Sequence, residues 1–145
     1  MLAGFGGAFS QIGYPSGSAA LNYQNSERLL VFKLGGGPVP LPPVVKRELQ
    51  PTPVALTQDP AIIKKGESLI GRCAGCHGFR GIPNAYPDLW NLPAATHAAF
   101  ESIVYEGALS YAGMPSFKDA LSLDDVKAVH AFIVADEITL RQAKK

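Results

Sequence analysis

The feature that most constrains this chain is the pentapeptide at residues 73–77, which reads Cys-Ala-Gly-Cys-His. A Cys-x-x-Cys pair followed directly by histidine is the attachment sequence of a c-type haem. The two thiols add across the vinyl groups of the porphyrin, and the adjacent histidine becomes an axial ligand of the iron. The chain is therefore expected to fold around one haem that is bonded to Cys73 and Cys76 and ligated by His77.

Other uses of the two cysteines fit the sequence less well. A structural zinc site needs four ligands, usually from two Cys or Cys/His pairs, and the chain has 2 cysteines in all. A thioredoxin-like redox pair belongs near a strand-to-helix junction of a βαβ unit, and no such alternation surrounds the motif. A disulfide across two residues would close a very small loop and stabilise little. A structural protein with a fortuitous motif is the remaining alternative.

The distribution of proline divides the chain into three parts. The chain has 12 prolines, and half of them lie between residues 38 and 53. Prolines at this density favour extended polyproline II, so we predict a Pro/Gly-rich linker over residues 35–58. At ~3.1 Å per residue it would reach up to roughly 70 Å. It separates residues 1–34 from a compact domain expected at residues 59–145.

Residues 1–34 contain one clear strand signal. The run from Arg28 to Leu34 is rich in β-forming residues and stops at three glycines, whereas residues 1–26 indicate turns and short irregular strands. A single strand cannot bury its own apolar side chains, so we expect it to belong to a sheet supplied by other residues. A flexible tail is the alternative.

Residues 59–145 show the periodicity of an all-α domain. A helix is predicted from Asp59, as N-cap before a proline, to Cys73. A second is predicted over residues 96–106 with Gly107 as its stop, and a third from the capping-box-like Ser122, ending in a solvated basic tail over residues 141–145. The irregular stretches at residues 78–93 and 107–121 are long for a small domain unless they enclose a group such as haem.

Composition and charge exclude some functions. The net charge is +1, which gives no indication of nucleic acid, and no apolar run is long enough to span a bilayer. The first basic residue is Arg28, so no secretory signal is visible at the start. Covalent haem attachment is normally extracytoplasmic, so we expect a periplasmic or otherwise extracytoplasmic location. The chain is then a piece of something longer, or is exported by means that it does not show.

The second axial ligand can be sought among few residues. Apart from Met1, the methionine available is Met114, and the other histidines are His97 and His130. Met114 lies between a glycine and a proline in a loop, where the backbone can present a thioether to the iron, whereas core methionines usually lie on a periodic helix face. We therefore predict Met114 as the ligand, and expect His97 and His130 at the surface or its boundary.

These motifs together resemble a known family. Residues 59–138 resemble a class I cytochrome c domain, with a helix that ends in the haem motif, a Pro-x-Leu segment at residues 87–89, a methionine loop and a closing helix. More narrowly, the chain resembles the C-terminal cytochrome domain of quinohaemoprotein alcohol dehydrogenases, preceded by the end of the propeller that binds pyrroloquinoline quinone (PQQ). The stretches that carry this likeness are residues 6–9, 28–36, 107–117 and 121–133.

The resemblance assigns further residues by position. It implies that the carbonyl of Pro87 accepts from the ring N–H of the haem histidine. It also implies that Leu89 and Phe117 pack on the haem, and that Tyr86 or Trp90 bonds a propionate. Two helix positions complete the set, since Gly66 and Phe132 match the close crossing of the first and last helices. Ile70 stands where many members have Phe or Tyr.

The resemblance also implies a function. A His/Met-ligated haem c would accept electrons one at a time from reduced PQQ and pass them to an external acceptor, either a small redox protein or a quinone. PQQ and the catalytic residues would belong to a propeller domain in cis or trans, so no catalytic residue is assigned and this chain alone would not oxidise alcohols. The alternatives are a separate haem subunit whose residues 1–34 complete the propeller of another chain, and a stand-alone cytochrome c.

Overall fold

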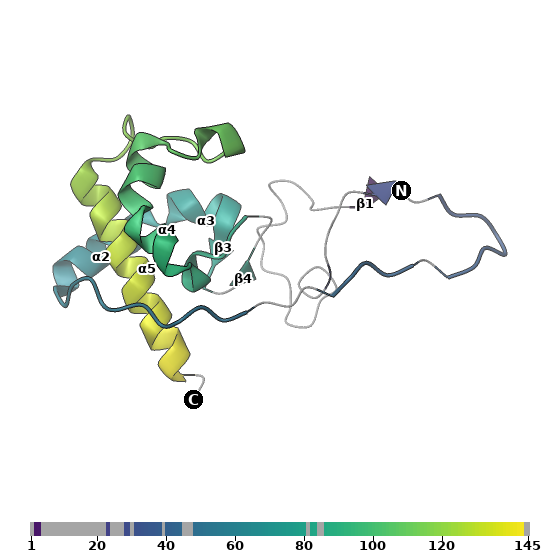
Figure 1. Cartoon of the computed structure of the whole chain (residues 1–145), viewed down its shortest axis with the longest axis horizontal. Coiled ribbons are helices and arrows are strands. Elements are labelled where there is room, and N and C mark those ends of the chain that lie inside the picture. Colours follow the sequence, from purple (N-terminus) through teal and green to yellow (C-terminus); the bar gives the residue numbers. More distant parts are fainter. Residues whose placement is uncertain are drawn as a thin grey trace.

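The computed structural model describes residues 2–3, 23, 28–29, 31–38, 40–44, 48–80, 82–83 and 86–143. Its helical part is built from α2 (Pro60–Leu69), α3 (Gly71–His77), α4 (Ala94–Ala98) and α5 (Leu123–Ala143). Short turns of helix, η2 (Leu89–Asn91), η3 (Ser102–Glu106) and η4 (Ser110–Ala112), join them. The predicted all-α fold is confirmed (Figure 1). No helix in these ranges is both long and apolar enough to cross a membrane.

The first helix begins where the sequence predicts and is interrupted before it reaches the cysteines. Asp59 caps α2 by accepting from the backbone N–H of Ala61 at 2.8 Å, and Pro60 occupies the first turn, where no N–H is needed. One continuous helix to Cys73 was expected, but a turn at Ile70 separates α2 from α3. The Ile70 N–H still bonds the Gly66 carbonyl, and the Ile70 carbonyl accepts from the N–H groups of Cys73 and Ala74, so backbone hydrogen bonds continue through the turn.

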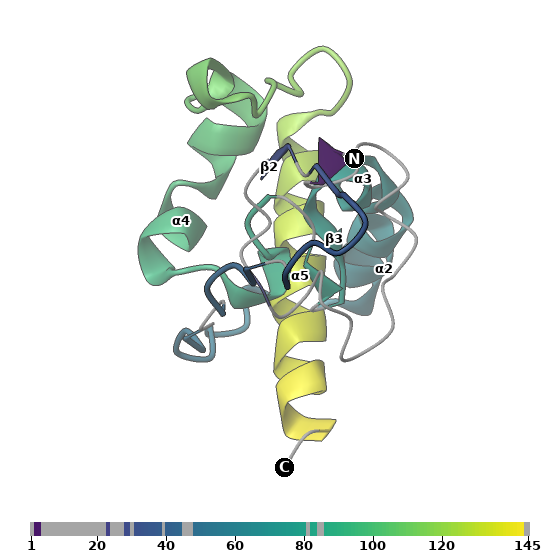
Figure 2. The same ribbon diagram turned by 90° about the vertical axis from the view of Figure 1, so that its right-hand side faces the viewer.

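The crossing of α2 and α5 depends on the absence of a side chain at Gly66. A Cβ atom at this position would lie 2.0 Å from the carbonyl oxygen of Ala128 and 2.7 Å from the Cβ of Phe132. The predicted close crossing is therefore present. In Figure 2, α5 runs through the middle of the domain with α2 and α3 to one side and α4 to the other.

The second predicted helix is less regular than its periodicity indicates. It begins at Ala94, two residues before the predicted start, and its last turn is the π-helical η3. Gly107 ends it with φ 79°, a left-handed conformation that favours glycine. A Cβ on Gly107 would also lie 2.8 Å from the Cβ of Ser116, so this stop is packed against the following loop.

The last helix is capped as predicted, and of its predicted solvated tail Gln142 and Ala143 are exposed, Arg141 is not, and residues 144–145 lie outside the described residues. Ser122 and Asp125 form a reciprocal capping box: the Ser122 N–H donates to Asp125 Oδ2 at 2.8 Å, and the Asp125 N–H donates to Ser122 Oγ at 3.2 Å. At the other end α5 continues to Ala143, and the prediction that Arg141 is solvated is wrong. Its guanidinium is partly buried against Glu137 and residues of other segments.

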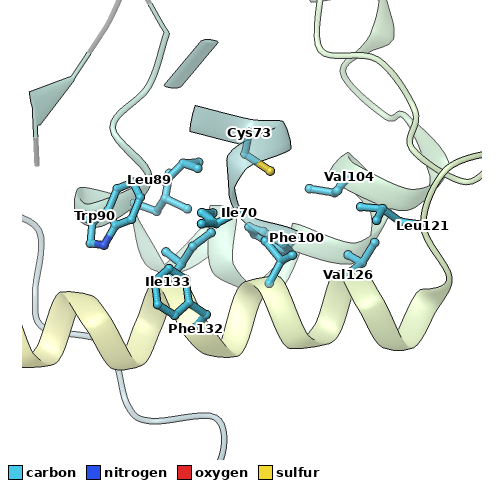
Figure 3. Close-up of a cluster of buried hydrophobic side chains, with 12 residues drawn as sticks. Ile70, Cys73, Leu89, Trp90, Phe100, Val104, Leu121, Val126, Phe132 and Ile133 are labelled. Atoms are coloured by element: carbon cyan, nitrogen blue, oxygen red, sulfur yellow. The ribbon is translucent and has the colours of Figure 1, made fainter. Parts of the chain in front are cut away.

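The core lies along α5, and the apolar side chains that join it come from α3, η2, η3 and the segments between the helices, with Ile63 and Leu69 of α2 partly buried against it. Figure 3 shows Trp90 at one end of this cluster and Val104, Leu121 and Val126 toward the other, with Cys73 above it. Ile133 and Val126 are completely buried. Ile70, which stands where many members of the resembled family have Phe or Tyr, is also buried. The core members are Ile70, Cys73, Leu89, Trp90, Leu92, Phe100, Val104, Leu121, Val126, Val129, Phe132 and Ile133.

Two small antiparallel pairs lie outside the helices. β1 (Leu2–Ala3) pairs with β2 (Arg28–Leu29), and β3 (Gly78–Phe79) pairs with β4 (Ile82–Pro83) just after the haem motif. The strand predicted from Arg28 to Leu34 is thus confirmed only at its start, because residues 31–33 have no regular structure and a turn follows at Leu34. Val31 and Leu34 are exposed, at 87% and 103%.

Candidate functional site

The residues predicted to hold a haem line one apolar cleft. Its walls come from α3, the segment around η2, the region of α4 and η3, and the loop after η4. All seven predicted site residues are among those that line it: Cys73, Cys76, His77, Pro87, Leu89, Met114 and Phe117. The cleft holds about 240 Å³. Cys73 and Met114, which are 41 positions apart in the sequence, are therefore brought to one site.

The helix α3 presents the motif to the cleft. Cys73 is buried and Cys76 is exposed, so the two thiols lie at the floor and the rim. Burial, and to a smaller degree the neighbouring Cys76, raises the pKa of the Cys73 thiol to about 11, while Arg72 opposes the shift. Both cysteines are free, not joined in a disulfide.

The ring of His77 is oriented by a backbone carbonyl. Its Nδ1 atom lies 2.8 Å from the carbonyl oxygen of Pro87, which can only accept. The ring must therefore carry its proton on Nδ1, and Nε2 is left with a lone pair for a metal. The contact expected from the Pro-x-Leu segment is thus present in the structure.

The loop that carries Met114 is fixed by hydrogen bonds on both sides. The Met114 N–H donates to the Leu109 carbonyl at 3.2 Å, and Gly113 before it has φ 92°. After it, the Ser116 hydroxyl donates to the Tyr105 carbonyl at 2.6 Å and the Phe117 N–H to the Val104 carbonyl at 2.9 Å. Met114 is half-buried at the cleft in a non-helical segment, as predicted for a ligand loop.

The remaining predicted contacts divide into two groups. Leu89 is buried and Phe117 half-buried, and both line the cleft. Tyr86 also lines it, is 48% exposed, and has its ring 6.1 Å from that of His77. Trp90 instead donates its indole N–H to Asp136 at 2.9 Å and is not a lining residue, so Tyr86 is the better candidate of the two for a propionate.

Some residues at the site were not predicted. Arg72 lines the cleft and donates to the Ala120 carbonyl at 3.2 Å; its place before Cys73 was a signal that could have identified it. Phe100 also lines the cleft and stacks on His130, with ring centroids 4.1 Å apart. His130 is only 8% exposed, so its predicted surface or boundary position is wrong.

The two histidines outside the motif form a pair behind the cleft. His97 Nδ1 lies 2.9 Å from His130 Nε2, so one ring must donate to the other. Burial, and to a smaller degree His97, lowers the pKa of His130 to about 4. Neither histidine lines the cleft itself, whereas Met114 does, which separates the candidates for the second axial position.

The chemistry of this donor set fits a covalently attached haem. An apolar cleft excludes water, two thiols provide attachment points, and an imidazole nitrogen and a thioether are the axial ligands of c-type cytochromes. Among the lining residues Arg72 is the one cation, and there is no carboxylate. The arrangement can bind and orient a haem.

Comparisons with known proteins identify relatives of the chain. No protein-family model matches the chain. The chain is 37% identical over 142 residues to quinohemoprotein alcohol dehydrogenase ADH IIB of Pseudomonas putida, which covers 94% of this chain and 20% of that protein. It is 34% identical over 145 residues to quinohemoprotein alcohol dehydrogenase ADH-IIG of the same organism, covering 97% and 20%.

A solved structure gives the same result. The structure of quinohemoprotein alcohol dehydrogenase ADHIIG from Pseudomonas putida HK5 matches with a TM-score of 0.63 at 34% identity, over 76% of this chain and 16% of that one. The chain therefore spans about a fifth of the length of the curated relatives that it matches.

Proposed function

Because this chain is a relative of the quinohemoprotein alcohol dehydrogenases and corresponds to their cytochrome c domain, we propose that it carries one covalent haem c and transfers single electrons. The observation that carries the proposal is the convergence of Cys73, Cys76, His77 and Met114 on one apolar cleft. The identity of over 30% across nearly the whole chain supports it.

Each residue has a distinct role in this proposal. Cys73 and Cys76 would hold the haem by thioether bonds, while His77 Nε2 and the Met114 sulfur would ligate its iron. The Pro87 carbonyl holds the imidazole in its ligating orientation, as the 2.8 Å contact indicates. Leu89 and Phe117 pack on the porphyrin and exclude water. When bound, the haem supplies reversible one-electron exchange, and thioether ligation raises its potential.

The partner of this domain is proposed from the relatives. In the complete protein, electrons would come from the reduced PQQ of a propeller domain that oxidises an alcohol, and would leave to an external acceptor such as a small redox protein or a quinone. The chain by itself would carry electrons without oxidising alcohol. Covalent haem attachment places the whole in the periplasm or another extracytoplasmic compartment.

One structural observation favours a second arrangement. Val31 and Leu34 are almost fully exposed just after β2, so both apolar side chains are available to pack against another body. Residues 1–34 would then complete the propeller of a separate catalytic chain. Co-purification with a large quinoprotein, or recovery of dye reduction on mixing, distinguishes this arrangement from a stand-alone cytochrome c.

The experiment that tests the haem proposal is spectroscopic. The full chain, expressed together with a haem-attachment system, should show the sharp visible bands of a reduced low-spin c-type haem after dithionite. Its intact mass should exceed that of the polypeptide by one haem. An apo mass with two free thiols would refute the proposal.

A further inference from the structure

The segment at residues 48–50 is held on the helical domain through its backbone. The Asn91 side chain donates from Nδ2 to the Glu48 carbonyl at 3.0 Å and accepts at Oδ1 from the Gln50 N–H at 2.8 Å. A single side-chain amide thus bonds a carbonyl and an N–H two residues apart on one segment. Asn91 is at the end of η2, more than forty residues further along the chain.

Arg141 adds a second contact to the same segment. Its Nη1 donates to the Gln50 carbonyl at 2.7 Å, and its Nη2 donates to Asn91 Oδ1 at 3.2 Å. Glu137, one turn earlier on α5, is fully buried and pairs with the same guanidinium. The buried Glu137 carboxylate therefore holds the Arg141 guanidinium in the orientation in which it donates to the Gln50 carbonyl.

The chain beyond this point stays on the domain. Pro51, Val54 and Leu56 line a groove whose other wall includes Leu92 and Val134. In Figure 1 the segment that leads into α2 runs across α5. The contact at residues 48–50 is thus where the chain first meets this groove.

We propose that Asn91 and Arg141 form a docking site for an extended peptide backbone, with residues 48–50 of this chain as its occupant. Each of these three bonds to the segment ends on a backbone atom of Glu48 or Gln50, so the site tolerates changes of their side chains. The unit that moves as one body is then residues 48–143, and the spacer that remains is residues 35–47. That spacer reaches about 40 Å at polyproline II rise. The proposal goes beyond electron transfer and stands without it.

The test is amide hydrogen exchange of the full chain, followed residue by residue by NMR. The Gln50 amide should be protected in the parent chain and exchange about tenfold faster in Asn91→Leu, since a hydrogen bond of ordinary strength is lost. Arg141→Lys should weaken the protection less than Asn91→Leu does. The lysine keeps a cation beside Glu137 but cannot donate from two nitrogens as the guanidinium does. Glu48→Ala and Gln50→Ala should leave the protection of the residue-50 amide unchanged.

The matched control is Gln142→Ala, an exposed change beside Arg141 on the same helix. It should leave the Gln50 amide unaffected, and amides in α5 should stay protected in every variant used. An unprotected Gln50 amide in the parent chain, or protection that survives Asn91→Leu, would overturn the proposal. Loss of protection with Gln50→Ala would overturn the recognition of backbone alone. None of these outcomes depends on whether haem is the bound group.

Discussion

His77 Nδ1 and the Pro87 carbonyl oxygen lie 2.8 Å apart, although one residue ends a helix and the other lies in an irregular segment. This contact decides which nitrogen of the imidazole carries the proton and which faces the cleft. It also couples the orientation of the ring to the segment that positions Leu89, since only one residue separates Pro87 from it. The His77 imidazole and the apolar wall of the cleft are thereby placed together.

Removing the Met114 side chain should leave the iron of the proposed haem without its sixth ligand, and the haem should stay attached. In Met114→Ala the two thioether bonds and His77 remain, so the haem should stay attached while the sixth position becomes available to carbon monoxide. The measurement is the change in the visible spectrum of the reduced protein on adding carbon monoxide. His97→Ala is the control and should not react, because His97 lies outside the lining of the cleft. Carbon monoxide reactivity that is the same in Met114→Ala and the parent would show that another residue is the ligand.

The helix crossing should not tolerate a methyl group. Gly66→Ala places a Cβ 2.0 Å from the Ala128 carbonyl oxygen, and we expect the free energy of unfolding to fall by roughly 3 kcal/mol. Chemical denaturation followed by circular dichroism measures this. Gly71→Ala is a matched control, since a Cβ there meets nothing within 4 Å, and it should leave stability unchanged or higher. Equal losses in both variants would contradict the account of the crossing.

The capping box of α5 should contribute measurably to stability. Ser122→Ala removes the side chain that accepts from the Asp125 N–H, and loss of such a cap costs about 1 kcal/mol. Ser68→Ala is the control, because the Ser68 hydroxyl donates to the Lys65 carbonyl within α2 and does not cap the helix. A melting temperature lowered by Ser68→Ala as much as by Ser122→Ala would count against the cap.

Stability should fall on acidification through His130. Its pKa is lowered from 6.5 to about 4 in the folded protein, so the unfolded chain binds a proton first as the pH falls. With respect to His130, the free energy of unfolding therefore has its full value above about pH 6.5. It falls progressively as the pH is lowered to about 4. Denaturation at a series of pH values should show a shallower loss in His130→Leu. The charged groups that line the cavity beside this pair, Glu101 and Lys127, remain in both proteins. Identical pH profiles for the two would rule out His130 as the source.

The predicted site residues that line the cleft could be picked out from the sequence because they are rare residue types or carry local signals. The pentapeptide, a single methionine between glycine and proline, and the caps at Asp59 and Ser122 each depend on neighbours in the chain. Contacts over long separations were not predictable in this way. The His97–His130 pair and the bond from Arg141 to Gln50, 91 residues away, follow from how α5 packs, and no local pattern encodes them. Arg141 looked like part of a basic tail because two of its acceptors, Gln50 and Asn91, come from other segments.

The contact between Gly66 and Ala128 has a consequence for the order of folding. It closes a loop of roughly sixty residues, and the entropy cost of closure grows only slowly with length. The residues that line the cleft all lie between these two helices in the sequence. Once the helices meet, this part of the chain is therefore tethered at both ends. Pairing of the terminal helices before the haem arrives would therefore hold Cys73 and Cys76 next to a partly assembled pocket, so that attachment becomes a local event within a chain whose topology is already set.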